Sequence, residues 1–227
     1  MSRIPRVVGV GLPHHVTQRG NNREQVFFSD DDRRFYLQVL RKYAQAYGVE
    51  VWAYCLMDNH VHVLGVPESE ESLARCFGGT NLVYTQYVNR AQGRSGRLWQ
   101  NRFFSCPVDK DAYLWPVLRY IERNPVRARL VRLPWEHQWS SARHHVLGEP
   151  DLTTAGPGWL REEMRKTDYR SYVQRESRPS VTAAIRRMTA TGRPLGNVRF
   201  TAQLESKLDR ELTPAKIGRP RRSTQGK

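Results

Sequence analysis

The sequence predicts an α+β fold in which a four-stranded sheet and two helices alternate in the order β-α-β-β-α-β, with a third helix after the last strand. Two observations lead to this class. Apolar side chains recur at helical spacing over residues 29–48 and 68–91. Between these helices, residues 49–56 and 60–66 form two apolar runs joined by a polar turn, which is typical of a β-hairpin. With one strand before and one after this unit, the order is that of the split βαβ, ferredoxin-like arrangement.

The amino-terminal elements carry their own boundary signals. Residues 14–19 predict the first strand, which the turn-forming Gly20-Asn21-Asn22 ends. A short extended segment is expected at residues 25–28. Ser29 then precedes three aspartates, which is typical of a helix N-cap with an acidic first turn. We expect this helix to stop at Gly48.

The remaining elements follow the hairpin. In the helix at residues 68–91, the low helix propensity of Gly78-Gly79 predicts a weak point or kink. A glycine-containing break separates it from a fourth strand at residues 102–108. Residues 111–124 predict the third helix, which Pro125 closes because proline cannot continue the backbone hydrogen bonding.

Composition narrows the class of partner. The 227 residues include 37 Lys and Arg against 22 Asp and Glu, a net charge of +15, which favours a polyanion and most often nucleic acid. The chain is short for a TIM barrel of about 250 residues. It has no run of roughly 20 apolar residues and no apolar leader, so we expect a cytoplasmic protein without a membrane partner. The three cysteines form no C-x-x-C pair and read as small hydrophobic residues.

Two segments are expected, residues 1–148 with the predicted fold and a basic DNA-binding extension at residues 149–227, joined by a Gly- and Pro-containing linker. The final 53 residues hold 13 Lys and Arg against 4 Asp and Glu, which accounts for +9 of the net charge. Residues 200–212 can form a short helix. Beyond it, Arg219, Arg221 and Arg222 lie in a sequence that resembles an AT-hook core for a narrow minor groove. A disordered basic tail is the equal alternative.

His60 and His62 are the most informative residues of the chain. Side chains alternate between the faces of a strand, so these two imidazoles project together while Val61 and Val63 enter the core on the other face. Such a pair provides half of a divalent-metal site. The alternative is a chance pair of surface or core histidines.

The predicted topology indicates where further ligands lie. Both crossover helices cover one face of the sheet, so His60 and His62 face the other, which the helix at residues 111–124 is placed to cover. On that helix Tyr120 and Asn124 are four residues apart, one above the other. An amide oxygen suits Mg²⁺ or Mn²⁺, and a tyrosine one turn away can act as a nucleophile. Alternatively, both residues only pack or end the helix. Tyr113, seven residues earlier, is the rival nucleophile.

Three motifs together resemble a known family. They are His60-Val61-His62, the segment LWQNRFF at residues 98–104 and the segment YIERNPVRA at residues 120–128. In this order and spacing they resemble the single-tyrosine HUH transposases, and most closely their REP-associated tyrosine transposase branch, over residues 13–139.

The resemblance implies an enzyme that cleaves and joins single-stranded DNA beside imperfect hairpins. His60, His62 and Asn124 would hold Mg²⁺ or Mn²⁺, and Tyr120 would attack the DNA to give a 5′-phosphotyrosine. In related transposases a glutamine can fill the role of Asn124 as the further metal ligand. His15, within the segment HVTQRG at residues 15–20, also matches the family and reads as structural or DNA-contacting. The resemblance implies either a monomer or a homodimer that exchanges its tyrosine helices.

Several aromatic and arginine side chains are candidates for contact with DNA. An aromatic ring can stack on a base, and an arginine can bind a phosphate. The alternatives are buried aromatic residues and solvated charges. The stacking candidates are Trp99 and Phe103, and the phosphate candidates are Arg19, Arg23, Arg97, Arg102 and Arg127.

Two other functions remain open at this point. The chain could be a DNA-binding regulator that kept the fold without cleavage, or a metal hydrolase acting on small phosphoesters. The intact His60, His62 and Tyr120 argue against the first, and the basic extension argues against the second.

Overall fold

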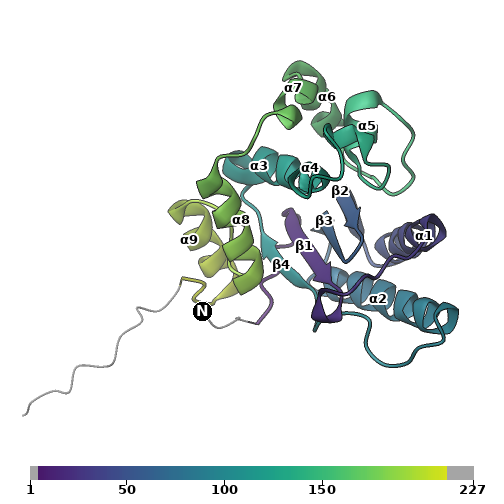
Figure 1. Cartoon of the computed structure of the whole chain (residues 1–227). Helices are drawn as coiled ribbons and strands as arrows, with labels where there is room; N and C mark the ends of the chain where they lie inside the picture. The colour runs from purple at the N-terminus through teal and green to yellow at the C-terminus, as the bar shows by residue number, and fades with distance from the viewer. Residues whose placement is uncertain (1–4, 214–227) are drawn as a thin grey trace, which may run out of the picture.

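The protein is built around a four-stranded antiparallel sheet (Figure 1). The computed structural model describes residues 5–213. The strands are β1 (His14–Arg19), β2 (Val49–Met57), β3 (His60–Pro67) and β4 (Phe104–Pro107), and they lie in the order β2-β3-β1-β4. Strand β1 pairs with β3 on one side and with β4 on the other. The predicted α+β class is therefore confirmed.

Helices α1 (Asp30–Ala46) and α2 (Ser72–Ala91) cover one face of the sheet (Figure 1). The side chain of Ser29 accepts a hydrogen bond from the Asp32 amide, and the Asp32 carboxylate accepts one from the Ser29 amide, so Ser29 is the N-cap of α1 as the sequence predicts. Burial of apolar surface drives the packing here. The core on this face includes Val16, Val61 and Val63 of the sheet and Tyr36, Phe77 and Tyr84 of the helices.

The opposite face of the sheet is covered by α3 (Lys110–Glu122) and α4 (Asn124–Arg127), and by helices from the carboxyl-terminal part of the chain. A second core forms between them. Leu64 of β3 packs there with Leu118 and Ile121 of α3 and with Ile185 of a later helix. Strand β3 thus alternates, with Val61 and Val63 on the α1–α2 side and His60, His62, Leu64 and Val66 on the α3 side.

The rest of the described chain contains short helices. These are η1 (Asn21–Arg23), η2 (Pro134–Glu136), α5 (Ala142–Leu147), α6 (Gly158–Lys166), α7 (Tyr169–Gln174), α8 (Pro179–Thr191) and α9 (Val198–Leu208). Among residues 5–213, no helix is both long and apolar enough to cross a lipid bilayer.

The residues after position 148 pack closely on those before it. The amide of Ala155 donates a 2.7 Å hydrogen bond to the carbonyl of Val51, at the edge of the sheet. Leu195 exchanges backbone hydrogen bonds with the β4 end of the sheet, through Pro107 and Asp109. Helix α8 contacts β4 and β1 (Figure 1). The predicted extension therefore shares the second core, whereas the AT-hook-like arginines Arg219, Arg221 and Arg222 lie outside the described residues.

Residues 25–28, predicted as a short extended segment, are not a strand of the sheet, and the amides of Val26 and Phe27 both donate to the carbonyl of Asp58. Two local predictions differ from the structure. Helix α2 runs without a break through Gly78-Gly79. Pro125 does not end the helical backbone, since α4 follows α3 with the proline in its first turn, where its missing N–H costs nothing.

Candidate active site

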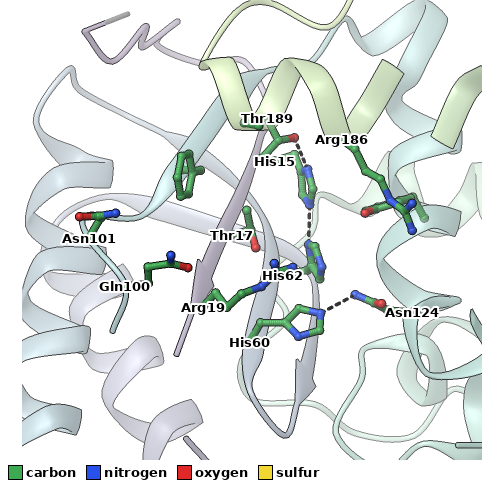
Figure 2. A pocket seen from close by; sticks show the side chains of 13 residues that line it. His15, Thr17, Arg19, His60, His62, Gln100, Asn101, Asn124, Arg186 and Thr189 are labelled. Carbon is green, nitrogen blue, oxygen red and sulfur yellow. Dashed lines mark hydrogen bonds between the residues drawn. The ribbon is translucent and has the colours of Figure 1, made fainter. Parts of the chain in front are cut away.

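A cavity of about 530 Å³ opens on the α3 side of the sheet, between β1, β3, the α3–α4 joint and α8 (Figure 2). Buried side chains form its floor, and exposed polar side chains form its rim. The floor includes His15, His62, Tyr120, Asn124 and Thr189, and the rim includes Arg19, Gln100, Asn101 and Arg186. Two strands, the α3–α4 joint and a late helix therefore supply one site.

His60 and His62 lie side by side in this cavity, with ring centroids 5.1 Å apart. Their position follows from strand alternation, since Val61 and Val63 are fully buried against α1 and α2. His60 Nδ1 lies 2.6 Å from the Oδ1 of Asn59, which fixes the ring orientation. The amide nitrogen of Asn124 lies 3.4 Å from the other ring nitrogen, Nε2 (Figure 2). The structure thus brings together the three residues predicted to hold a metal ion.

Burial keeps both imidazoles neutral. It lowers the pKa of His60 to about 4, together with smaller contributions from the positive charges of Arg19 and Arg127. Burial also holds the pKa of His62 well below its usual value, with neighbouring His15 adding to the effect. A neutral imidazole is the form that ligates a metal, so these rings are ready to coordinate at neutral pH.

The donor set fits a hard divalent cation. Within residues 5–213, no group of three or more His, Cys, Asp or Glu side chains is placed to hold a metal ion. The Asn124 amide lies next to His60 and is the candidate for a third protein ligand. Two imidazoles with an amide oxygen leave positions for water or phosphate oxygens, which suits Mg²⁺ or Mn²⁺.

His15 enters the same site from β1. Its Nε2 lies 2.8 Å from the Nδ1 of His62, and its Nδ1 lies 2.8 Å from the hydroxyl of Thr189. Burial lowers the pKa of His15 to about 3. The sequence left the role of His15 open between structure and DNA contact, and in the structure its ring contacts His62. The strand register could have indicated this contact, because Thr17 pairs with His62 and His15 lies two residues from Thr17 on the same face of the sheet.

Tyr120 stands against the histidines. Its ring centroid is 5.6 Å from those of both His15 and His62, and its side chain is 5% exposed. Neighbouring Leu118 and Ile121 pack into the second core, which leaves Tyr120 on the side of α3 that faces the cavity. Tyr113, the rival nucleophile, packs against that core and does not line the cavity.

The predicted DNA-contacting residues divide into two groups. Arg19 lies on the cavity rim, and Arg23, Arg97 and Arg102 are exposed. Arg97 and Arg102 line a second hollow of about 570 Å³ that shares Asn101 with the cavity. Exposed arginines of this kind remain available to phosphates.

The other predicted contacts are turned inward. Trp99 and Phe103 are only 7% and 4% exposed and pack in the α1–α2 core, so the structure supports their alternative interpretation as buried aromatic residues. Arg127, predicted to bind phosphate, is half-buried beside Tyr120, where its guanidinium covers the ring. Burial lowers the pKa of Arg127.

Sequence reasoning missed two lining residues, Arg186 and Thr189 of α8. They stand on one face of the helix, three residues apart, and Figure 2 shows the Thr189 side chain meeting His15, with Arg186 extending to the right of the histidines. No local pattern ties them to His60 and His62, which lie more than a hundred residues earlier. Only the tertiary fold brings them to the site.

Comparisons with known proteins agree with this geometry. Residues 10–124, about half of the chain, match the family described as transposase IS200 like. Over 129 residues the chain is 27% identical to a Haemophilus influenzae protein described as a REP-associated tyrosine transposase, covering 48% of this chain and 73% of that protein. A solved structure of a REP-associated tyrosine transposase bound to a REP hairpin has a similar fold, with a TM-score of 0.53 and 21% identity over 69% of this chain and 93% of that chain. These matches confirm the resemblance drawn from the three motifs.

Proposed function

Because the chain belongs to the IS200-like transposase family, we propose that it cleaves and rejoins single-stranded DNA beside hairpin sequences through a covalent 5′-phosphotyrosine. One observation carries the proposal. A tyrosine, two neutral histidines and an amide from separate elements converge on one cavity with an arginine on its rim. A nucleophile, a cation site and a phosphate contact are the parts that phosphodiester transfer needs.

Tyr120 is the proposed nucleophile. Its phenolic oxygen attacks the scissile phosphorus while the bond from phosphorus to the 3′ oxygen breaks. The phenol loses its proton and the departing 3′ oxygen gains one, so the products are a 5′-phosphotyrosine and a free 3′-OH. An incoming 3′-OH reverses the step and releases the phenol. The covalent link conserves the bond energy, so joining needs no nucleotide cofactor.

His60, His62 and the amide oxygen of Asn124 would hold Mg²⁺ or Mn²⁺. When bound, such an ion neutralises charge on the non-bridging phosphate oxygens and orients the phosphate for in-line attack. The chain itself keeps the two rings neutral by burial and fixes the His60 ring through Asn59. Arg127 holds the tyrosine ring from the other side.

The substrate class follows from charge and from the similar structure. Arg19 and Arg186 place positive charge on the cavity rim, and the whole chain carries a net charge of +15. Both features suit a DNA strand that enters the cavity. The REP hairpin bound in the similar solved structure supports a hairpin with a single-stranded flank as the substrate of this chain.

The proposed site is complete within one chain. Tyr120, the histidine pair and Asn124 all belong to the same molecule, and the tyrosine needs no exchange of helices to meet the histidines. We therefore propose a monomer as the active form.

A labelled oligonucleotide tests the chemistry. The protein is incubated with Mn²⁺ and a hairpin that has a single-stranded flank, labelled at either its 5′ or its 3′ end. A 5′-phosphotyrosine attaches the protein to the downstream fragment, so we expect the 3′ label to migrate with the protein and the 5′ label with a shortened free strand. Tyr120→Phe should remove the adduct and Tyr113→Phe should retain it.

The same assay separates the other functions. If the protein binds the hairpin but forms no covalent adduct with any divalent metal ion present, it is a DNA-binding regulator. Release of phosphate from nucleotides, with the hairpin left intact, would indicate a hydrolase of small phosphoesters. An adduct that persists in Tyr120→Phe would overturn the assignment of the nucleophile.

A further inference from the structure

A chain of buried hydrogen bonds runs from α8 to His62. The hydroxyl of Thr189 lies 2.8 Å from the carbonyl oxygen of Ile185, one turn earlier on α8, and 2.8 Å from the Nδ1 of His15. The Nε2 of His15 then lies 2.8 Å from the Nδ1 of His62. Thr189, His15 and His62 are 4%, 1% and 6% exposed, so water does not compete for these bonds.

The carbonyl at one end sets the direction of every bond in this chain. A carbonyl oxygen can only accept, so the single proton of the Thr189 hydroxyl goes to Ile185. The hydroxyl oxygen must then accept from the Nδ1–H of His15. A neutral imidazole has one N–H, which leaves the Nε2 of His15 as an acceptor and makes the Nδ1 of His62 the donor.

The two rings also have the relative orientation that this bond requires. The His15 and His62 planes differ by only 9°, and their centroids are 5.0 Å apart with the bonded nitrogens 2.8 Å apart, so the rings meet edge to edge and the lone pair of one nitrogen faces the N–H of the other. With its proton on Nδ1, His62 has its lone pair on Nε2. The reverse tautomer would place a proton on Nε2 and block coordination there.

We propose that Thr189 and His15 are positioning residues that hold His62 in the tautomer whose Nε2 can bind the metal ion. This inference rests on the proposed function for its purpose, but the tautomer itself is a property of the metal-free protein. It makes α8 part of the active site, although this helix lies beyond residues 10–124 that match the family.

The tautomers can be read directly. Long-range proton–nitrogen correlation spectra of the ¹⁵N-histidine-labelled, metal-free full chain at neutral pH distinguish a protonated from an unprotonated ring nitrogen. The chain has 7 histidines, which single variants assign. We expect Nδ1 protonated and Nε2 unprotonated in both His15 and His62. Protonation of His62 at Nε2 would overturn the proposal.

Variants of α8 test the cause. Thr189→Val keeps the shape but removes the acceptor, so the two rings should lose their preference for the Nδ1–H form. Misplaced second-sphere partners lower metal affinity roughly 10- to 100-fold, and we expect a loss of that size in Mn²⁺ binding followed by electron paramagnetic resonance. Thr189→Ser should retain both the tautomers and the affinity.

A neighbouring threonine provides the matched control. Thr191 lies on the same helix, is 7% exposed, and bonds its hydroxyl to the carbonyls of Arg187 and Met188 rather than to a histidine. Thr191→Val should leave the histidine spectra and the Mn²⁺ affinity unchanged. Equal losses in Thr189→Val and Thr191→Val would indicate general damage to α8 and reject the positioning role. The expected tautomers in a protein that forms no DNA adduct would reject the proposed function alone.

Discussion

The guanidinium carbon of Arg127 lies 4.1 Å from the centroid of the Tyr120 ring, and its Nη1 donates a 2.7 Å hydrogen bond to the Tyr120 carbonyl oxygen. One side chain therefore holds both the backbone and the ring of the proposed nucleophile. A planar guanidinium can stack on the ring while it donates elsewhere, whereas an ammonium cannot do both equally well.

Replacement of Arg127 by lysine should slow DNA cleavage. The cation–π contact contributes about 1–2 kcal/mol in a partly desolvated site, which corresponds to roughly 5- to 30-fold in rate. The measurement is the single-turnover rate of adduct formation with saturating hairpin. Arg132→Lys, at an exposed position, is the control and should match the wild type. Equal rates in the two variants would show that Arg127 does not position Tyr120.

Arg186 should contribute to DNA binding. It is exposed on the cavity rim, so its loss in Arg186→Ala should weaken hairpin binding and reduce the slope of log affinity against log salt by about 1. Arg187→Ala removes another exposed arginine of the same helix, one that does not line the cavity. Fluorescence anisotropy across a salt series compares the two. An unchanged slope in Arg186→Ala would exclude a phosphate contact.

The two adjacent glycines of α2 should respond in opposite directions to alanine. A Cβ on Gly79 would lie 2.0 Å from the ring of Tyr43 in α1, so Gly79→Ala should destabilise the fold by about 1–3 kcal/mol through overpacking. A Cβ on Gly78 would meet no atom within 4 Å, so Gly78→Ala should stabilise by up to about 1 kcal/mol through helix propensity. Urea denaturation measures both. Stabilisation by Gly79→Ala would mean that the helices do not approach closely there.

Acid should destabilise the protein in part through His14. Burial lowers the pKa of this histidine from 6.5 to about 4, and the Gly9 amide donates to its Nε2 while its Nδ1 bonds the carbonyl of Leu12. Between those two pKa values the unfolded chain takes up a proton that the folded chain does not. Stability therefore falls as the pH drops from 6.5 toward 4, and His14 accounts for about 2 kcal/mol between pH 7 and pH 5.

The His14 contribution can be separated from that of the other buried histidines. His14→Gln should reduce the loss of unfolding free energy between pH 7 and pH 5 by about that amount. His144→Gln, which replaces a half-buried histidine near the surface, should retain the full loss. Denaturation curves at the two pH values decide the matter. An identical pH dependence in His14→Gln and the wild type would show that folding does not shift the pKa of His14.

The parts of the site that follow a fixed period were predictable from sequence. Strand alternation placed His60 and His62 on one face, a rule that depends only on local backbone geometry. Asn124 lines the same cavity as Tyr120, as the helical spacing predicts, although α3 ends at Glu122 and Asn124 begins α4, so the two residues do not share one continuous helix.

The other parts depend on which elements meet in space. Nothing near Thr189 in the sequence reveals that it contacts His15, which lies 174 residues away. Trp99 is an aromatic residue in a segment with arginines, which made it a candidate for base stacking, but it packs against Tyr36 of α1 and Tyr84 of α2. The low helix propensity of Gly79 predicted a weak point in α2. In the structure the ring of Tyr43 comes so close that a side chain at position 79 would clash with it, which accounts for the glycine.

The residues that line the cavity also limit how many DNA ends one molecule can hold. Of the described residues that line it, one is a tyrosine, so each molecule can carry one DNA end at a time under the proposed chemistry. Excision of a segment requires two cuts and therefore either two molecules acting together or one molecule acting twice, with its first strand rejoined or released in between. A lone molecule is thus suited to single nicks and local strand exchange at one hairpin.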